Sequence, residues 1–551
     1  MTSQKTVAEV IADELYQAGV RTVFGQPGGE VVDLMEAMAQ RGIEFVLMGL
    51  ESGAALAAAT LGQATGVPGV CLATLGPGAC NLTLGIGDAF LDRHPLLAIS
   101  ARTSDEATWY NHQRLDLNAV FAPISKASVA LDGTNTAAQI QNAVKLATTP
   151  PRGPVYLSLP SRTAVQIEKK IWNRSNALDY GSGLETTEAW PERSRRAVTT
   201  KGMGKIVTAL NRAERPVLVV GIALDQRKDA AAIREFLAVT GLPYADTPKT
   251  KGLVDPNGAG FLGTFLSASG DTIINEQIRQ SDCILGIGYD PVETTYDWHL
   301  GDNYYVVADG PTGFGSFQPP VEAIGDVTAM VKQLTEQYDG LSSWTAAELS
   351  EIRTQVTAKI TPAVPSSEQG LAPLTAAQTL RAALPDNTHL TVDTGQHKMI
   401  FAQAWQTNLP LSYFNSNGLS SMSTSVPGAI ALAHANPELP VVSVSGDGGF
   451  AMMVQELETV NRLGITPLFV VLVDQALSLI RIPQQMRGIP SRGVDFAPVD
   501  WAMVAEGFGV RGVWARTEHE LQAAVAEWVD APQATVIAVQ IDEALYCGNA
   551  Y

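Results

Sequence analysis

The feature that most limits how this chain can fold is a unit that recurs along it: a short apolar run, a glycine-rich turn, and then the pattern of a helix. The runs are almost continuously apolar, which is typical of strands buried on both faces of a sheet. They are RTVF, GVCLAT, PLLAIS and PVYLSL in the first third of the chain, RPVLVVGIAL, DCILGIGYD and YYVVADG in the middle, and HLTVDTGQ, PVVSVSGDGG, PLFVVLVDQ and TVIAVQID in the last third. Apolar strands that alternate with helices form doubly wound parallel sheets. The sequence therefore predicts an α/β protein.

The chain is long enough for several such sheets. Its 551 residues exceed the size at which a single hydrophobic core stops growing. Two stretches, 166–195 and 338–372, are polar and aperiodic, and we interpret them as linkers. We therefore expect three doubly wound domains, at residues 1–165, 196–340 and 371–551.

Charge and cysteine content exclude several classes of protein. The formal net charge is −19, and binding a nucleic-acid backbone needs a basic face instead. A small anionic ligand stays compatible with this charge, since backbone N–H groups or a metal can hold it. The cysteines show neither a disulfide framework nor zinc-like spacing; they are Cys71, Cys80, Cys283 and Cys547. The N-terminal segment predicts an amphipathic helix rather than a signal peptide, and no run of about 18 apolar residues predicts a membrane span. We expect a soluble, cytoplasmic enzyme with neither a nucleic-acid nor a membrane partner.

The most informative motif is GDGG, at the end of an apolar run in the last third. Its glycines, Gly446, Gly448 and Gly449, would let the backbone approach a phosphate, and a helix start would present free N–H groups. Asp447 adds a hard oxygen ligand there, and the next apolar run ends in Asp474. Neighbouring parallel strands would bring the two carboxylates together in a setting suited to Mg²⁺. The competing interpretation is a plain turn with a helix-capping aspartate.

The spacing of these two aspartates resembles the diphosphate–metal motif of thiamine-diphosphate-dependent enzymes. That family has Asn where this chain has Asp474, while its catabolic acetolactate synthase branch includes Asp there. The resemblance implies pyrimidine-binding, central and diphosphate-binding domains, in that order. It also implies thiamine diphosphate as cofactor and Mg²⁺ held by Asp447, Asp474 and the backbone carbonyl of Ala476.

Motifs in the first domain fall in the family's order. VFGQPGGEVVDLMEAM resembles its FGxPGG segment, and ATLGPGACNLTLGIGDAFLDRHPLLAIS resembles its SGPGATN segment, with Leu75 in place of Ser. LMGLESGAALAAA places Glu51 where the family keeps a catalytic glutamate. By itself Glu51 could simply favour the dipole of a helix start. The resemblance implies cofactor contacts from this domain at Gln26, Pro27, Gly28, Gly76 and Asn81.

Two further motifs lie in the last domain. VDTGQHKM resembles the phosphate-proximal GQH turn, which implies cofactor contacts at Gly395, Gln396 and His397. NSNGLSSMSTSVPGAIALA resembles GGLGTMGxGLPAAIGA, with serines at three glycine or small positions, Ser420, Ser423 and Ser425. The resemblance makes Ser420 a cofactor contact and Met422 the bulky residue that holds the cofactor bent. Met422 could otherwise be an ordinary core methionine.

Other segments refine the expected activity. NHQRLDLNAVFAPISKAS resembles a stretch of acetolactate synthases whose Gln faces the substrate; His112 and Gln113 are the implied catalytic residues, and Phe121 and Lys126 match without a defined role. LGIGYDPVETTYDW resembles the FAD-independent branch, and IRIPQQ stands where the anabolic enzymes have a tryptophan. FAD is therefore not expected.

These features favour a carboligase that decarboxylates a 2-oxo acid, with pyruvate the first candidate, and joins the product to a second carbonyl. The alternatives are a non-ligating decarboxylase or lyase of another 2-oxo acid, and a non-catalytic thiamine-diphosphate-binding protein. Adjacent histidines are usual in pyruvate-type decarboxylases, whereas here His112 precedes Gln113, which favours ligation. In the family the cofactor lies between subunits, so we expect a homodimer or homotetramer with shared sites.

Overall fold

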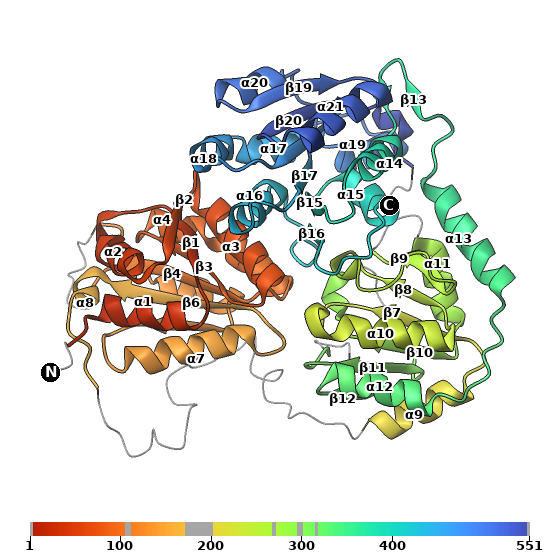
Figure 1. Cartoon of the computed structure of the whole chain (residues 1–551), viewed down its shortest axis with the longest axis horizontal. Helices are drawn as coiled ribbons and strands as arrows, with labels where there is room; N and C mark the ends of the chain where they lie inside the picture. The colour runs from red at the N-terminus through yellow and green to blue at the C-terminus, as the bar shows by residue number, and fades with distance from the viewer. Residues whose placement is uncertain are drawn as a thin grey trace. The chain divides into compact units, whose positions relative to one another are not determined.

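The computed structural model describes residues 4–104, 112–170, 202–266, 271–294, 301–313 and 318–547 (Figure 1). Within these ranges the main sheets are three, all parallel, and helices pack against them. The predicted α/β class with doubly wound sheets is confirmed. Residue contacts divide the chain into two compact units, Met1–Arg195 with Ile430–Ala435, and Arg196–Ala429 with Asn436–Tyr551. No helix in the described part of the chain is long and apolar enough to cross a membrane.

The first sheet has the strand order β2-β1-β3-β4-β6-β5. Its strands are β1 (Thr22–Gly25), β2 (Glu44–Leu47), β3 (Gly69–Ala73), β4 (Leu96–Arg102), β5 (Ala127–Ala130) and β6 (Pro154–Pro160). The helices include α1 (Val7–Gln17), α2 (Val32–Arg41), α3 (Glu51–Thr65), α5 (Thr83–Leu91), α6 (Leu117–Phe121) and α7 (Thr136–Thr148). Thr6 and Glu9 form a capping box that starts α1, which explains why the helix begins where it does.

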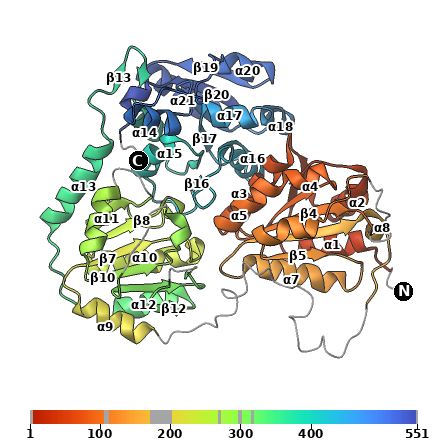
Figure 2. The ribbon, with the colours of Figure 1, turned by 180° about the vertical axis from the view of Figure 1, so that it is seen from behind.

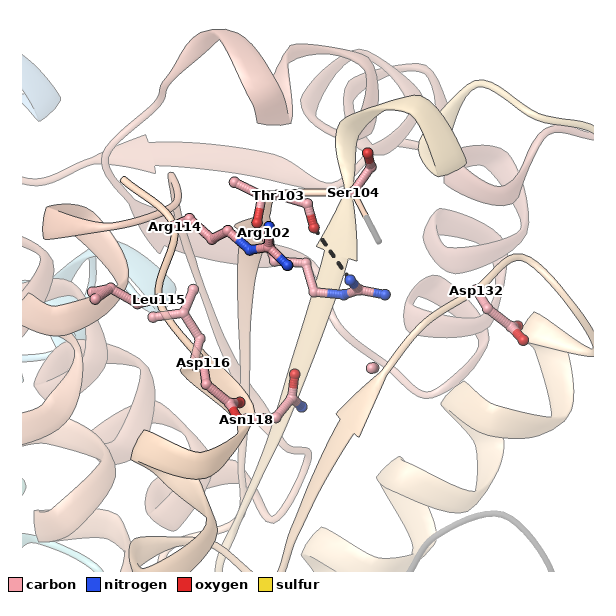
Figure 3. Close-up of a pocket in the computed structure, with 10 residues that line it drawn as sticks. Arg102, Thr103, Ser104, Arg114, Leu115, Asp116, Asn118 and Asp132 are labelled. Atoms are coloured by element: carbon pink, nitrogen blue, oxygen red, sulfur yellow. Dashed lines mark hydrogen bonds between the residues drawn. The ribbon is translucent and has the colours of Figure 1, made fainter. Parts of the chain in front are cut away.

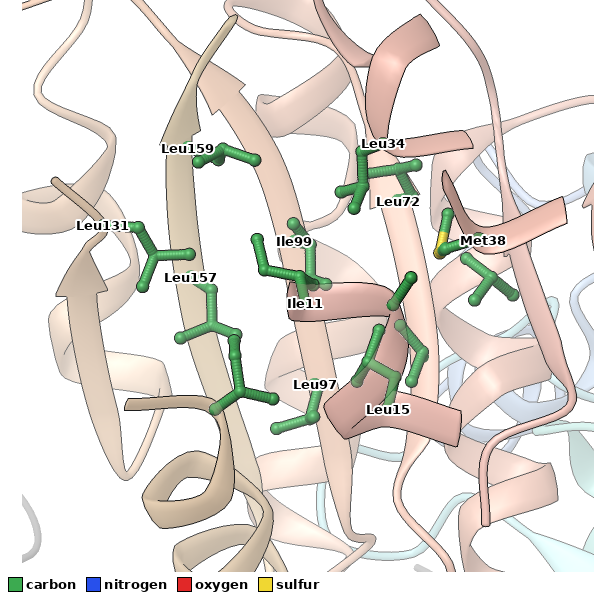
Figure 4. Close-up of a cluster of buried hydrophobic side chains, with 14 of the residues drawn as sticks. Ile11, Leu15, Leu34, Met38, Leu72, Leu97, Ile99, Leu131, Leu157 and Leu159 are labelled. Atoms are coloured by element: carbon green, nitrogen blue, oxygen red, sulfur yellow. The ribbon is translucent and has the colours of Figure 1, made fainter. Parts of the chain in front are cut away.

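The core of this unit lies between the sheet and one helix layer. Ile11 and Leu15 of α1 are fully buried and face strand residues such as Leu97 and Ile99 (Figure 4). Leu34 and Met38 of α2 extend the same cluster. The period of the apolar residues in α1 therefore fixes which face of the helix covers the sheet.

The second sheet has the order β12-β11-β10-β7-β8-β9. Its strands are β7 (Pro216–Val220), β8 (Tyr244–Asp246), β9 (Phe261–Thr264), β10 (Cys283–Ile287), β11 (Tyr304–Ala308) and β12 (Val321–Ile324). The helices include α9 (Met203–Arg212), α10 (Gln226–Thr240), α11 (Asp271–Gln280) and α12 (Val327–Gln337), labelled in Figure 2. This is the strand order of the dinucleotide-binding fold, and its topological switch point lies between β7 and β10.

The third sheet has the order β16-β15-β17-β18-β20-β19. Its strands are β15 (His389–Val392), β16 (Tyr413–Asn415), β17 (Val441–Gly446), β18 (Leu468–Val473), β19 (Arg511–Ala515) and β20 (Thr535–Gln540). The helices include α14 (Pro373–Ala383), α15 (Gln396–Ala404), α16 (Ser425–Ala435), α17 (Asp447–Met453), α18 (Glu456–Leu463), α19 (Ser478–Met486), α20 (Trp501–Gly507) and α21 (Glu518–Asp530). Counted along each domain, the first and third sheets share one strand order, 2-1-3-4-6-5. Both therefore have a switch point between their first and third strands.

The structure differs from the sequence interpretation in the two predicted linkers. Residues 166–170 are not free of the first domain, because Ile167 pairs with Thr6 and Lys169 pairs with Thr134. The stretch 338–372 contains the helix α13 (Ala346–Ile360) and a short hairpin of β13 (Ser366–Ser367) and β14 (Gly370–Leu371). The buried residues of α13 that join the core of the central sheet are Leu349, Ile352 and Val356. The linker interpretation missed this helix because only one narrow stripe of it is apolar.

Candidate active site

The turn after β1 lies at the switch point of the first sheet. The side chain of Gln26 donates to the carbonyls of Met48, at 3.0 Å, and Gly49, at 2.6 Å, so it ties this turn to the segment before α3. Gly28 lies against Thr74, since a Cβ on Gly28 would be 2.4 Å from Thr74 Oγ1. Pro27, between them, is exposed. The close approach to Thr74 explains why residue 28 is a glycine.

Glu51 is the first residue of α3, where the sequence predicts a helix start. Its side chain is 6% exposed, and its Oε2 accepts a hydrogen bond of 2.9 Å from Asn81 Nδ2. Its Oε1 lies beside Gly78, where a Cβ would be 3.0 Å away. The carboxylate does not cap its own helix, because α3 has no side-chain capping bond. Glu51 and Asn81, thirty residues apart, therefore meet in the structure.

Gln113 lies against the turn that follows β3. Gly76 has a φ of 63°, and a Cβ there would be 2.7 Å from Cβ of Gln113. Gln113 itself has a φ of 58°, an unfavourable conformation for a residue with a side chain. His112 is exposed. The structure thus brings Gln113 to Gly76 but gives His112 no comparable packing.

A pocket of about 720 Å³ continues from this segment (Figure 3). Its lining residues are Arg102, Thr103, Ser104, Arg114, Leu115, Asp116, Leu117, Asn118, Ala130 and Asp132. Asp116 caps α6 by accepting from Ala119 N, and Asp132 accepts from Thr134, so both carboxylates serve the local backbone. The guanidinium of Arg102 donates to the carbonyl of Thr103. The pocket lies beyond the carboxyl ends of β4 and β5, where ligands of such sheets bind.

Phe121 and Lys126, which the sequence left without a role, are structural. Phe121 is fully buried, with its ring centroid 4.1 Å from that of Tyr156. Lys126 is 1% exposed, and its Nζ donates to the carbonyls of Leu146, Thr149 and Pro151. Burial, with the nearby charges of Arg93 and Arg152, lowers the pKa of Lys126 to about 7. Its hydrogen bonds therefore hold the C-terminal end of α7 and the residues that follow it.

Asp393 connects the segments that flank the switch point of the third sheet. Its carboxylate accepts hydrogen bonds from the backbone N–H groups of Ser423, at 2.9 Å, and Thr424, at 3.0 Å. The same carboxylate faces Gly449, where a Cβ would be 2.1 Å from Oδ2. Burial raises the pKa of Asp393 to about 6, opposed by these donors. A single buried acid thus ties the 393–397 turn to the loop after Met422 and lies against the GDGG turn.

The imidazole of His397 lies between two of these turns. A Cβ on Gly395 would be 2.6 Å from its Cε1, and one on Gly446 would be 3.5 Å away. Its Nε2 is buried and has no hydrogen-bond partner among the described residues. Burial and the charge of Lys398 lower the pKa of His397 to about 4, so the ring is neutral near pH 7. Gln396 is buried beside it.

Met422 lies between two serines with left-handed backbone. Ser420 has a φ of 52° and Ser423 a φ of 75°, a conformation that glycine adopts without a steric cost. Ser420 Oγ donates to the carbonyl of Asn417 and accepts from Lys398 Nζ. Met422 itself is half-buried rather than part of the core.

Asp447 and Asp474 occupy the carboxyl ends of neighbouring strands, as the sequence predicts. β17 pairs in parallel with β18, and Asp447 Oδ2 accepts from Gln475 N at 2.9 Å. Asp474 accepts from Ala476 N and from Ser478 Oγ. Burial and the charge of Asp474 raise the pKa of Asp447 to about 7, while burial, with the charge of Glu543, raises the pKa of Asp474 to about 6. The charge of Asp474 therefore opposes the ionisation of Asp447.

The segment from Asp474 to Ala476 is held on its other side as well. Ala476 pairs with Asp495 through bonds made by Gln475 O and Leu477 N, so the carbonyl of Ala476 points away from that partner. Arg481 braces this arrangement by donating to Glu543, to Asp495 and to the carbonyl of Asp474. The backbone of Gln475 has a φ of 58°.

The side chain of Glu293 lies at the switch point of the central sheet, between the ends of β7 and β10. Glu293 is 2% exposed, and its Oε2 accepts from Ile222 N at 2.8 Å, after β7. Its Oε1 accepts from Thr247 Oγ1. A Cβ on Gly221 would be 2.3 Å from Glu293 Oε2 and 2.9 Å from the carbonyl of Gly288. In the segment LGIGYDPVETTYDW, the residues PVE therefore fill the space between the ends of β7 and β10. The part of this segment that follows Thr294 lies outside the described residues.

The structure thus gathers the predicted residues into two groups. One group, in the first unit, is Gln26, Gly28, Glu51, Gly76, Asn81 and Gln113; the other, in the second unit, is Gly395, His397, Met422, Gly446, Asp447, Gly449, Asp474 and Ala476. Two residues that support the second group were not predicted, Asp393 and Arg481. A signal for Asp393 existed, because an acid at the end of an apolar run precedes the GQH turn.

Comparison with known proteins gives these groups a family. The chain matches the profiles of the thiamine pyrophosphate enzyme N-terminal TPP binding domain at residues 5–120, central domain at 203–334 and C-terminal TPP binding domain at 393–539. Acetolactate synthase of Bacillus subtilis is 28% identical over 97% of this chain and 93% of its own length. Catabolic acetolactate synthase of Raoultella terrigena is 27% identical, over 97% of this chain and 95% of its own length. The large subunit of acetolactate synthase isozyme 2 of Escherichia coli is 30% identical over 97% of this chain and 95% of its own length.

The chain therefore belongs to the thiamine pyrophosphate enzymes, whose cofactor is also called thiamine diphosphate. Within that family it is an acetolactate synthase-like enzyme, as the sequence motifs predict.

Proposed function

We propose that this enzyme binds thiamine diphosphate and Mg²⁺, decarboxylates pyruvate, and joins the resulting two-carbon unit to a second 2-oxo acid, giving an acetolactate-type product. The observation that carries the proposal is the pair Asp447 and Asp474, held at neighbouring strand ends beside a buried nitrogen of His397 that has no hydrogen-bond partner among the described residues. The near-full-length relatives named acetolactate synthase support the reaction class.

The third sheet fits a diphosphate. His397 Nε2 is a buried polar atom in need of a partner, and it lies between Gly395 and Gly446, where side chains would block an approach. A neutral imidazole can donate one hydrogen bond to a phosphate oxygen. We assign Gly395, Gln396, His397, Ser420, Gly446, Gly448 and Gly449 to binding this end of the cofactor.

The same strand ends fit a divalent cation. Asp447 and Asp474 have raised pKa values because each is buried near other negative charge. A cation between them would reverse that unfavourable interaction, and carboxylate and carbonyl oxygens suit Mg²⁺. The carbonyl of Ala476, turned away from Asp495, would supply the third protein ligand.

In the first unit, Glu51 is the proposed catalytic acid–base group. When bound, thiamine diphosphate supplies a carbon centre that stabilises the negative charge left by decarboxylation. Glu51 holds or moves a proton at the pyrimidine end of the cofactor, and Asn81 orients its carboxylate. Gln26, Pro27, Gly28 and Gly76 are assigned to the surrounding cofactor contacts. Met422 would hold the cofactor bent.

The substrate assignment rests on the segment that begins at His112. Gln113, packed on Gly76, and His112 are the proposed substrate-facing residues. Arg102 and Arg114 give the adjoining pocket guanidinium groups of the kind that hold a carboxylate. A simple 2-oxo acid decarboxylase is the second candidate, because the serines beside Met422 alter a segment expected to line the reacting centre.

Three further expectations accompany the proposal. The domains are taken as 1–165, 196–340 and 371–551, and the active assembly as a homodimer or homotetramer in the cytoplasm. FAD is not expected, and the position of Glu293 supports this, because its carboxylate accepts the N–H of Ile222 at the crevice where a dinucleotide would bind.

Product analysis tests the function directly. The purified protein is incubated with thiamine diphosphate, Mg²⁺ and single or paired 2-oxo acids, and products are identified by mass. Pyruvate alone should give acetolactate and CO₂. An aldehyde as the sole product would favour the decarboxylase, and no product from any 2-oxo acid, with cofactor bound, would contradict both.

A further inference from the structure

We propose that the hydroxyl of Ser423 is a direct ligand of the cofactor's diphosphate, an inference that rests on the proposed function. Ser423 combines two unfavourable features. Its backbone has a φ of 75°, where a side chain is strained. Its Oγ is fully buried and has no hydrogen-bond partner among the residues that the structure describes. A buried hydroxyl without a partner is destabilising, so the arrangement points to a polar ligand.

The neighbours of Ser423 indicate which ligand. Its N–H donates to Asp393 Oδ2, the same oxygen that a Cβ on Gly449 would approach to 2.1 Å, so Ser423 lies beside the GDGG turn. Asp393 also provides the backbone hydrogen bond to the ring of His397. The residues with buried polar atoms left unpaired in these two connected segments of the described chain are Thr394, His397, Ser423 and Ser425. Unpaired polar atoms from two segments around one turn suit a ligand with several oxygens.

The hydroxyl also suits a phosphate chemically. A serine can donate one hydrogen bond to a phosphate oxygen, and a bond to a charged acceptor is stronger than a neutral one. Asp393 already receives backbone N–H donors, so it can remain in place beside an anion while its neighbours donate. At a position where the family motif has glycine, this chain therefore adds a side-chain donor to the backbone contacts.

The test measures Mg²⁺-dependent binding of thiamine diphosphate and of inorganic pyrophosphate by calorimetry, for the wild type, Ser423→Ala and Ser423→Gly. Both variants should bind both ligands roughly 10- to 100-fold more weakly, as expected for losing a hydrogen bond to a charged group. The melting temperature of the ligand-free variants should be equal to or above that of the wild type, because an unpaired hydroxyl is removed. A purely structural serine would instead lower that temperature.

Ser443→Ala is the matched control. Ser443, in β17, also has a buried hydroxyl without a partner in the described ranges, yet it precedes the GDGG turn and is outside the proposed site. This variant should bind pyrophosphate as the wild type does. If Ser423→Ala keeps wild-type affinity for both ligands, or changes only the KM of the 2-oxo acid, the hydroxyl is not a diphosphate ligand. Should the wild type itself bind neither ligand, the proposed function fails as well.

Discussion

At the scale of single residues, Glu51 is the buried acid that we propose as the proton-transfer group. It has a neutral partner, Asn81, and leaves its helix uncapped by a side chain. We expect Glu51→Gln to fold and bind thiamine diphosphate but to lose roughly 100-fold or more of its turnover and of hydrogen–deuterium exchange at the cofactor's C2, because a proton-transfer group is removed. Exchange followed by NMR checks this. Glu36→Gln, on the exposed face of α2, is the control, and wild-type exchange in Glu51→Gln would remove Glu51 from the mechanism.

Glu293 gives a prediction about pH. Burial, opposed by the bonds from Thr247 and Ile222, raises its pKa from 4.5 to about 8. The folded protein therefore binds a proton here more readily than the unfolded chain, so this contribution to stability is present below about pH 4.5 and is lost as the pH rises through about 8. Glutamine cannot ionise, so a Gln at position 293 removes this loss of stability at high pH. The melting temperature of Glu293→Gln relative to wild type should therefore rise between about pH 4.5 and about pH 8 and then level off, and a constant difference across that range would contradict the shifted pKa.

Candidate residues could be named from the sequence where a motif contains them, whereas the contacts between distant segments could not. Glu51, Asp447 and Asp474 follow from short patterns in the sequence. Asp393 had a sequence signal, the acid at the end of an apolar run, but its contacts could not be predicted, because they come from segments about thirty and fifty-five residues further along the chain. The left-handed backbone of Ser420 and Ser423 was equally hidden, although serine in place of glycine was visible.

At the scale of elements, inner strands were predictable and edge strands were not. The predicted apolar runs correspond to inner strands such as β3, β4, β17 and β18, which are buried along nearly their whole length. The strands that were missed are chiefly those at the sheet edges, β2, β5, β9, β12, β16 and β19. An edge strand such as β2 has one buried residue of four and therefore shows no apolar run. The inner strands carry the candidate site residues, so the meeting of Asp447 and Asp474 at neighbouring strand ends could be predicted even though each sheet was incomplete.

The neighbouring ends of β17 and β18 give a third prediction, about metal binding. Asp447→Ala should abolish Mg²⁺-dependent retention of thiamine diphosphate, because a charged oxygen ligand is lost beside two phosphates. Asp474→Asn should weaken retention by less than about tenfold, since an amide oxygen can replace the carboxylate oxygen. Cofactor retained after gel filtration, with and without Mg²⁺, measures both. Equal retention by Asp447→Ala and wild type would exclude Asp447 as a ligand.

At the scale of the whole molecule, Glu51, the proposed catalytic acid, and Asp447 and Asp474, the proposed metal ligands, lie in different compact units of the chain. If the cofactor is shared between subunits, Glu51→Gln and Asp447→Ala chains should each be inactive, whereas a mixture that exchanges subunits should recover part of the wild-type activity. One site of a mixed dimer would then carry both substitutions and the other neither. Activity assays on mixed, differently tagged chains test this, and confirmed exchange without recovered activity would contradict a shared site.

The common strand order of the first and third sheets has a consequence for how such an enzyme can arise. With the same connectivity, the loop after each strand occupies an equivalent place in both domains: Gln26 corresponds to Gly395, Glu51 to the segment around Met422, and the turn at Gly76 to Asp447. Copying one ancestral domain and altering only the residues of its loops would yield the two halves proposed above, one with the proton-transfer group and one with the cation ligands. No new strand order would be needed, because the residues of the loops can change while the strands and helices of both copies keep their pattern.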